Sequence, residues 1–281
     1  MEAHTPAAAA GTLKIGDDLT VNRLGFGAMR ITGQGIWGEP AEPAEARRVL
    51  RRAVELGVDF IDTADAYGPQ VSERLIAEAL HPYPRGLVIA TKGGLVRPSA
   101  PEWAADGRPA HLRAACEASL KRLKLGRIDL YQLHRIDSRV PLEDSIGELV
   151  RLQAEGKIRH IGVSNFGVSE LARARRITRI VAVQNRYNAG DRSSADVLAA
   201  CERDGLAFIP WAPLGRALGN GNLEAAARAH GVSGVEIAIA WLLAKSPAML
   251  PIPGTGSVAH LERNVASAGI RLSAGEVAEL G

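Results

Sequence analysis

The sequence predicts a single α/β domain, a closed (β/α)₈ TIM barrel, from two recurring features and from its length. Helix-like stretches end in glycine directly before a short apolar run at five places, Gly57, Gly86, Gly126, Gly156 and Gly205. Glycine favours the left-handed conformation that closes a helix, so each junction indicates a helix followed by a strand. The apolar runs recur at intervals of roughly 20 to 40 residues, and a chain of 281 residues is a usual length for one barrel.

Eight runs rich in Val, Ile, Leu and Ala are the expected strands. Nearly continuous apolar runs are typical of parallel strands that are covered on both faces. The segments that follow them carry helical periodicity, with one apolar residue every three or four positions. The eight runs are Leu24–Met29, Val58–Asp62, Leu87–Thr91, Ile128–Leu133, Arg159–Val163, Ile180–Gln184, Ala207–Pro210 and Met249–Ile252.

The two ends of the chain differ in what they predict. Thr12–Asn22 alternates polar and apolar residues around Gly16, Asp17 and Asp18, which indicates a β-hairpin that closes the bottom of the barrel. Residues 1–10 are expected to be a disordered tail. Because no Pro/Ser-rich linker divides residues 11–281, we expect one domain there.

Composition and charge argue against several classes of protein. Hydrophobic residues make up 46% of the chain, aromatic residues only 4%, and the net charge is +3. Arginines cluster on predicted helices without interleaved aromatic residues, which disfavours nucleic-acid binding. No segment is apolar enough for a membrane span or resembles a signal peptide. Cys116 and Cys201 lack CxxC or metal-ligand spacing, so we expect buried reduced thiols, no metal and a cytoplasmic protein.

Polar residues follow the ends of consecutive predicted strands, where a barrel of this kind carries its active site. Asp62 ends the second strand, Tyr67 lies in the next loop, Lys92 ends the third and His134 follows the fourth. Each alone is ordinary, as a structural ion pair, a packed aromatic or a helix cap. Together on one rim they indicate a common pocket, because buried polar groups must satisfy one another.

These four side chains suit the protonation of a carbonyl during reduction. A phenol with a pKa near 10 is a poor acid at neutral pH, and a nearby ammonium stabilises the phenolate. At about 4 Å and an effective dielectric of about 20, Lys92 would contribute roughly 4 kcal/mol, about three pKa units at most. Asp62 would keep Lys92 charged, and His134 would hold the substrate carbonyl.

Four segments, DFIDTADAYG, VIATK, LYQLHR and IGVSNF, resemble the aldo-keto reductase superfamily. The resemblance extends from Leu24 to Asn264 and implies a (β/α)₈ barrel, a preference for NADP(H), and Asp62, Tyr67, Lys92 and His134 as the catalytic tetrad. By the same resemblance, Ser164, Asn165 and Gln184 hold the nicotinamide carboxamide and Trp211 stacks on its ring.

Two further segments resemble the parts of this family that bind the phosphates of the dinucleotide. They are the loop after the seventh strand and the glycine-rich segment IPGTGSVAHLERN, where backbone N–H groups at a helix N-terminus would receive phosphate. The implied residues are Pro213, Leu214, Gly215, Arg216, Ile252, Gly254, Thr255, Gly256, Ser257, His260, Arg263 and Asn264.

This sequence departs from the family pattern in two places. Many NADPH-preferring members carry Lys or Arg at the positions of Gly254 and His260, so Thr255, Ser257, His260 and Arg263 would hold the 2′-phosphate here, and NAD(H) stays open. The chain ends soon after its last predicted helix, which implies a wide substrate pocket.

The first and last motifs are most similar to a bacterial branch that includes pyridoxal reductases. A small or aromatic aldehyde is the implied substrate, with Trp37 and Trp103 as candidate walls of its pocket. We expect a monomer or a weak homo-oligomer.

Two other functions remain open from the sequence. Lys92 could form a Schiff base, as in barrel aldolases, although Asp62 and Tyr67 favour a charged lysine. The chain could also be a non-catalytic NADP(H)-binding regulatory subunit. Reduction of a conjugated C=C bond is disfavoured, because related enzymes with that chemistry carry Glu at the position of His134.

Overall fold

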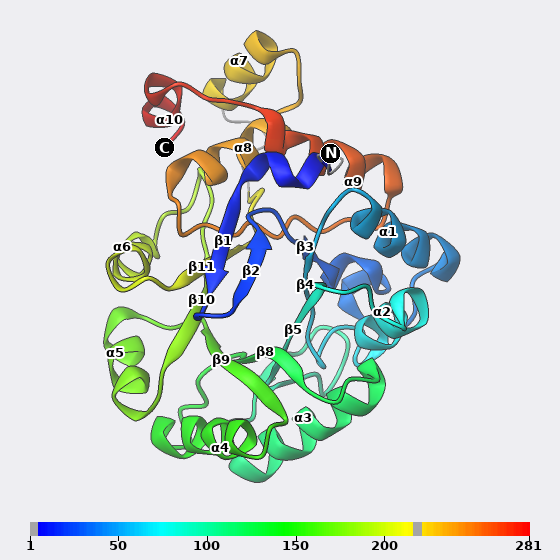
Figure 1. Cartoon of the computed structure of the whole chain (residues 1–281), viewed down its shortest axis with the longest axis vertical. Helices are drawn as coiled ribbons and strands as arrows, with labels where there is room; N and C mark the ends of the chain where they lie inside the picture. Colours follow the sequence, from blue (N-terminus) through cyan, green and yellow to red (C-terminus); the bar gives the residue numbers. More distant parts are fainter. Residues whose placement is uncertain (1–4, 216–220) are drawn as a thin grey trace.

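A computed structural model describes residues 5–215 and 221–281 and has the expected barrel architecture (Figure 1). Seven parallel strands curl into one sheet in the order β3-β4-β5-β8-β9-β10-β11. Their bounds are β3 Phe26–Gly27, β4 Phe60–Asp62, β5 Val88–Gly93, β8 Ile128–Leu133, β9 Ile158–Ser164, β10 Ile180–Arg186 and β11 Ala207–Trp211. A small antiparallel pair, β6 (Leu95–Val96) and β7 (Ala104–Ala105), follows β5 and was not expected from the sequence.

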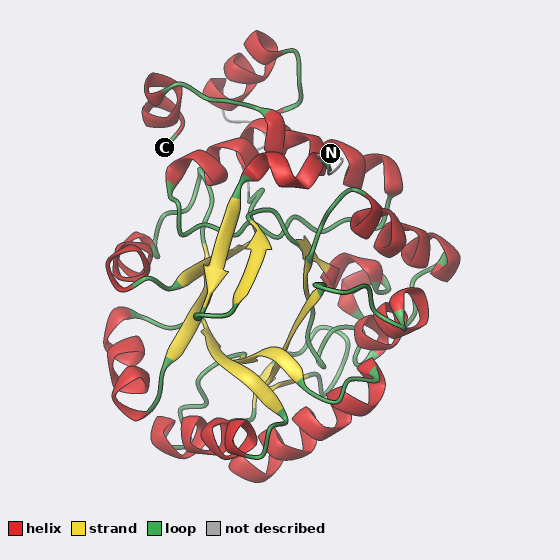
Figure 2. Ribbon diagram, in the orientation of Figure 1, coloured by secondary structure: helices red, strands yellow, loops and turns green. Residues whose placement is uncertain are grey.

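Helices surround the sheet, as the ring of red coils around yellow arrows in Figure 2 shows. None of those in the described residues is long and apolar enough to cross a membrane. Their bounds are α1 Pro43–Glu55, α2 Val71–Leu80, α3 Pro109–Leu123, α4 Leu142–Ala154, α5 Val168–Ile177, α6 Ala195–Asp204, α7 Gly221–His230, α8 Gly234–Lys245, α9 Val258–Ala266 and α10 Ala274–Leu280.

The eighth expected strand, Met249–Ile252, is wrong as a regular strand. It touches β11 through a single bridge between Phe208 and Met249, with Leu250 donating its N–H to the Phe208 carbonyl at 2.9 Å. Pro251 and Pro253 have no N–H to donate, so a continuous ladder cannot form across this segment.

The same segment nevertheless closes the barrel against β3. Gly25 donates its N–H to the Pro251 carbonyl at 2.9 Å. A side chain on Gly27 would come within 2.5 Å of the Ile252 carbonyl oxygen, and one on Gly254 within 2.2 Å of the Gly27 carbonyl oxygen. Glycine is therefore needed where the two backbones touch.

The hairpin β1 (Thr12–Ile15) and β2 (Leu19–Asn22) plugs the amino end of the barrel, as predicted. Ile15, Leu19 and Val21 pack in one cluster with inward-facing strand residues such as Phe60 and Leu130. Acidic residues of its turn form ion pairs near the amino ends of two strands: Asp18 pairs with Arg159 and His160 of β9, and Asp17 pairs with Arg179, directly before β10.

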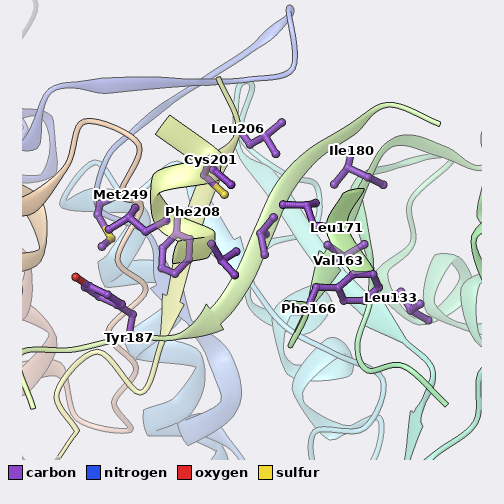
Figure 3. Close-up of a cluster of buried hydrophobic side chains, with 14 of the residues drawn as sticks. Leu133, Val163, Phe166, Leu171, Ile180, Tyr187, Cys201, Leu206, Phe208 and Met249 are labelled. Atoms are coloured by element: carbon purple, nitrogen blue, oxygen red, sulfur yellow. The ribbon is translucent and has the colours of Figure 1, made fainter. Parts of the chain in front are cut away.

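The space between the strands and the outer helices is filled by apolar side chains. Figure 3 shows part of this core, in which Phe208, Val163 and Ile180 meet Leu171 and Cys201 from the covering helices. Cys116 and Cys201 are buried free thiols, as expected, and burial raises the pKa of each to about 12.

The expectation of a disordered tail over residues 1–10 is wrong for residues 5–10. Pro6–Ala10 forms a 3₁₀-helix in which Ala7 is fully buried. Ala7 donates its N–H to the Leu56 carbonyl at 3.0 Å, and Arg271 donates to the Ala9 carbonyl at 2.9 Å. The segment is ordered because small alanine side chains fit against α1 and the segment after α9.

Candidate active site

Lys92 is the centre of a buried polar cluster at the carboxyl end of the strands. Its ammonium donates to Asp62 Oδ1 at 2.6 Å, to the Thr63 carbonyl at 2.8 Å and to the Tyr67 hydroxyl at 3.4 Å. All three N–H groups of the ammonium therefore have acceptors. The predicted contacts of Lys92 with Asp62 and with Tyr67 are thus present.

The pKa values of this cluster differ in part from the sequence-based expectation. Burial raises the pKa of Tyr67, and the Lys92 ammonium opposes this shift without overcoming it. The predicted lowering of the Tyr67 pKa is therefore wrong in the protein alone, because burial disfavours phenolate more than one ammonium favours it. For Lys92, burial acts to lower the pKa, but Asp62 and Tyr67 outweigh it, so the lysine stays charged.

His134 lies beside the phenol. The Tyr67 and His134 rings meet edge to face with centroids 5.8 Å apart. Burial, reinforced by Lys92, lowers the pKa of His134 well below its usual value, so the imidazole is neutral at pH 7. A neutral imidazole carries one N–H proton and can donate one hydrogen bond. A phenol and a neutral imidazole thus lie side by side in this cluster.

Asp62 is held by two amide side chains as well as by Lys92. Its Oδ2 accepts from Gln184 Nε2 at 2.8 Å and from Gln132 Nε2 at 3.1 Å. Gln184, expected at the nicotinamide carboxamide, thus also aims its amide group at the tetrad. Gln132 was missed in the sequence, where a polar residue inside the apolar run LYQLH was its only signal.

Asn165 links the ends of three strands. Its amide donates to the His134 carbonyl and to Ser164 Oγ, both at 3.1 Å, and its oxygen accepts from the Trp211 indole at 3.1 Å. Asn165 has a φ of +61°, a left-handed conformation that Asn adopts more readily than most residues. Asn165 also donates its backbone N–H to the Gln184 carbonyl at 3.0 Å, so all four residues predicted at the nicotinamide form one connected group.

A second part of the predicted site is a cavity of about 270 Å³ above the barrel edge. Six of its eight lining residues were expected to bind the dinucleotide, and Ser233 and Val235 were not. His260 and Arg263 make no ion pair within the described residues, so both can meet an anion. The six are Leu214, Gly254, Thr255, His260, Arg263 and Asn264.

The helix N-terminus beside this cavity already has a carboxylate partner. Glu45 of α1 accepts the backbone N–H of Val258, the first residue of α9, at 3.1 Å. This hydrogen bond, with Arg48, lowers the pKa of Glu45, so the carboxylate is charged. One of the N–H groups predicted to receive phosphate therefore already has an acceptor. The predicted phosphate contacts then depend more on the side chains of Arg263 and His260.

The remaining residues predicted to bind the dinucleotide lie in four places. Pro213 and Gly215 lie in the loop after β11, and Gly256 and Ser257 directly precede α9. The Ile252 side chain packs in the barrel interior, and its cofactor contact stays a prediction. Arg216 lies outside the described residues.

Trp37 and Trp103, the candidate walls of the substrate pocket, both contact Arg97. The guanidinium carbon of Arg97 lies over both indole rings, 5.3 Å from the centroid of Trp37 and 3.9 Å from that of Trp103. Arg97 was missed in the sequence, where it is one arginine in the loop after β6.

Comparison with known proteins agrees with this geometry. The model of the aldo/keto reductase family matches residues 23–281. An uncharacterised oxidoreductase of Schizosaccharomyces pombe is 49% identical over 277 residues, which cover 98% of this chain and 90% of the relative. Pyridoxine 4-dehydrogenase of Escherichia coli is 41% identical over 262 residues, which cover 90% of this chain and 92% of the relative.

A solved structure shares the fold. An aldo/keto reductase from Klebsiella pneumoniae, crystallised with NADP and acetate, has a TM-score of 0.82 and 27% identity, covering 96% of this chain and 93% of that one. The family match covers most of the chain, including every residue of the buried cluster around Lys92. The chain therefore belongs to the aldo/keto reductase family and is an oxidoreductase.

Proposed function

We propose that this protein reduces an aldehyde or ketone to the alcohol, reversibly, with NADPH as hydride donor and Tyr67 as proton donor. The observation that carries this proposal is the position of the Lys92 ammonium, which bonds Asp62 on one side and the Tyr67 hydroxyl on the other. Bound NADPH supplies the hydride that reaches the carbonyl carbon.

Each side chain of the cluster has a separate role in the proposed reduction. His134, neutral and next to Tyr67, donates a hydrogen bond to the carbonyl oxygen and orients it. The Tyr67 hydroxyl gives its proton to the alkoxide as charge develops there, and Lys92 stabilises the phenolate left behind. Asp62, fixed by its amide partners, keeps Lys92 charged and aimed. The raised pKa of Lys92 disfavours the Schiff-base alternative, which needs a neutral lysine.

NADP(H) is the proposed cofactor. Support comes from the Klebsiella structure, which was solved with NADP, and from the cavity where Arg263 and His260 have no anionic partner among the described residues. Ser164, Asn165, Gln184 and Trp211 would hold the nicotinamide end. The Glu45 carboxylate lies at the N-terminus of α9, where its negative charge opposes a 2′-phosphate. NAD(H), which has no 2′-phosphate, is therefore the second cofactor to assay.

The proposed substrate is a small or aromatic aldehyde, with pyridoxal as the first compound to test. The name of the Escherichia coli relative, pyridoxine 4-dehydrogenase, supports this choice. We further propose that the protein is cytoplasmic and acts as a monomer or weak homo-oligomer.

The test is NADPH oxidation by purified protein across pyridoxal, benzaldehyde, methylglyoxal and acetone, with wild type and Tyr67→Phe. Removal of the proton donor should lower kcat/KM by about 10²- to 10⁴-fold and leave the Kd of NADPH within about twofold. The control is Tyr83→Phe, which removes a hydroxyl whose one hydrogen bond among the described residues goes to the Leu123 carbonyl near the outer helices. Turnover of Tyr67→Phe near the wild-type rate would overturn the proton-donor assignment, and wild-type protein inert toward every carbonyl would overturn the activity.

A further inference from the structure

Arg97 joins two loops beside the candidate active site. Its guanidinium donates to the carbonyls of Ala100 and Glu102 in its own loop. It also crosses to the loop after β3, where it donates to the carbonyl of Ile36 at 2.8 Å and that of Gly35 at 3.2 Å. Arg97 is buried, so these bonds are shielded from water and hold the two loops firmly together.

The loop after β3 is in turn attached to the residue that follows Tyr67. Trp37 forms a bridge with Gly68, and Gly68 donates its N–H to the Ile36 carbonyl at 3.3 Å. Trp37 is therefore fixed relative to the backbone of Tyr67, and Arg97 fixes Trp103 relative to Trp37. The three loops follow β3, β4 and β5, which are neighbours in the sheet.

The backbone that meets Arg97 adopts an unfavourable conformation. Gly35 and Ile36 both have left-handed φ values, +69° and +60°. A β-branched residue such as Ile36 rarely adopts this conformation, and such strain persists only where the surrounding structure enforces it. Here it turns two successive carbonyls to one guanidinium. The strain points to a role for this arrangement beyond stability.

The result is a pair of indole rings on one cation, both partly open to solvent. Trp37 is 37% exposed and Trp103 is 36% exposed, although their shared partner Arg97 is buried. Exposed aromatic rings on loops that are tied to the loop of Tyr67 are suited to contact a flat ligand, because rings already held in place lose little conformational entropy on binding. The guanidinium itself already donates to four backbone carbonyls, so it is poorly placed to bind an anionic substituent.

We propose that Arg97 is a specificity-determining positioning residue: it assembles Trp37 and Trp103 into an aromatic wall beside Tyr67 that selects planar aromatic aldehydes over small aliphatic ones. This inference rests on the proposed carbonyl reduction. It assigns Arg97 no contact with the substrate; the residue acts through the two rings.

The test compares Arg97→Met with wild type and with Arg203→Met, a control that removes an exposed arginine whose ion pair, in the part of the chain that the structure describes, is with its neighbour Asp204. For benzaldehyde, KM should rise at least tenfold in Arg97→Met with kcat changed less. For methylglyoxal, kcat/KM should stay within about threefold of wild type. Arg97→Lys should behave like Arg97→Met, since lysine cannot bridge four carbonyls.

A double-mutant cycle separates this role from general destabilisation. Trp37→Leu and Trp103→Leu should each raise KM for benzaldehyde, and adding Arg97→Met to the Trp37→Leu/Trp103→Leu protein should change KM little further. An equal loss for benzaldehyde and methylglyoxal in Arg97→Met, or full additivity in the cycle, would overturn the inference while leaving the carbonyl reductase activity intact.

Binding gives a readout that does not need turnover. Tryptophan emission titrated with benzaldehyde in the presence of NADP⁺ reports occupancy of the wall. Arg97→Met should weaken this binding at least tenfold, and unchanged affinity would overturn the inference. Wild-type protein that binds benzaldehyde in this way without reducing it would contradict the proposed function alone.

Discussion

The two ends of the barrel both carry ion pairs at the ends of strands, but in opposite surroundings. At the carboxyl end the side chains of Lys92 and Asp62 are 0% and 2% exposed. At the amino end those of Arg179 and Asp17 are 62% and 77% exposed. The geometry of the second pair is no worse, since both guanidinium ends reach the carboxylate.

The difference lies in what each pair does for the molecule. When an exposed ion pair forms, each charge loses water contacts whose free energy is similar to that of the new partner. Such a pair therefore contributes little to stability. A buried pair has lost its hydration, so each charge depends on its partners and is fixed in direction. The Lys92 ammonium is therefore held in a fixed position relative to the Tyr67 hydroxyl, whereas Arg179 contributes an exposed ion pair to the hairpin turn. Burial, more than the presence of charge, distinguishes the functional end.

The largest expected effect comes from breaking the buried pair. Lys92→Met leaves the Asp62 carboxylate buried without its cation, which should lower the free energy of unfolding by about 3–5 kcal/mol. It should also abolish measurable carbonyl reduction, because the phenolate of Tyr67 loses its stabilising charge. Chemical denaturation and NADPH oxidation measure the two effects.

A double variant keeps this prediction testable if Lys92→Met does not fold. Asp62→Asn/Lys92→Met removes both charges and should recover much of the lost stability without recovering activity. Activity near wild type in a folded double variant would show that the charged pair is not part of the chemistry.

A smaller effect is expected at Gln132, whose side-chain amide donates to Asp62. Gln132→Leu removes one of the two amide donors on Asp62 Oδ2, a bond to a charged group that contributes about 1.5–3 kcal/mol. We expect kcat to fall about tenfold with little change in KM. Gln153→Leu is the matched control, since the Gln153 amide donates to the Arg159 carbonyl near the amino end, away from the cluster around Lys92. A fall in both variants would mean that stability, and not Asp62, was affected.

The cofactor cavity allows a more modest change in preference. His260→Arg places a guanidinium next to Arg263, and one added charge-assisted hydrogen bond to a 2′-phosphate should tighten NADPH about tenfold relative to NADH. Arg263→Met should shift the ratio in the opposite direction. Kd values for both cofactors, measured by fluorescence, report the ratio. Parallel changes for NADPH and NADH would place the 2′-phosphate elsewhere.

The smallest effect is expected at the amino end. Arg179→Met removes an exposed pair from the hairpin turn, so the denaturation midpoint and kcat/KM should both match wild type within error. Asp18 still binds Arg159 and His160 in this variant, which keeps the turn attached. A loss of activity in Arg179→Met would contradict the distinction between the two ends.

Patterns local to the chain were enough to predict the barrel and its tetrad. Gly57, Gly156 and Gly205 have left-handed φ values directly after α1, α4 and α6, as predicted. The prediction is wrong at Gly86, since α2 already ends at Leu80, and at Gly126, since Lys124 takes the left-handed position after α3. The apolar runs report burial, and seven of the eight predicted strands lie in the sheet. Strand ends in a parallel barrel share one rim, so Asp62, Tyr67, Lys92 and His134 could be brought together without coordinates. The prolines beside Met249–Ile252 were visible too, but their effect depended on which backbones they met.

What only the tertiary structure decided involves groups that are far apart in sequence and have no periodic signal. Three contacts depend on loop paths and side-chain direction. They are the hydrogen bond from Gln132 to Asp62, the one from the N-terminus of α9 to the Glu45 carboxylate, and the one from Arg97 to the Gly35 carbonyl. The pKa of Tyr67 also belongs here, because it follows from the balance between burial and one ammonium. The sequence alone determined that Asp62, Tyr67, Lys92 and His134 lie on one rim, whereas the packing around them determined their further partners and how strongly they interact.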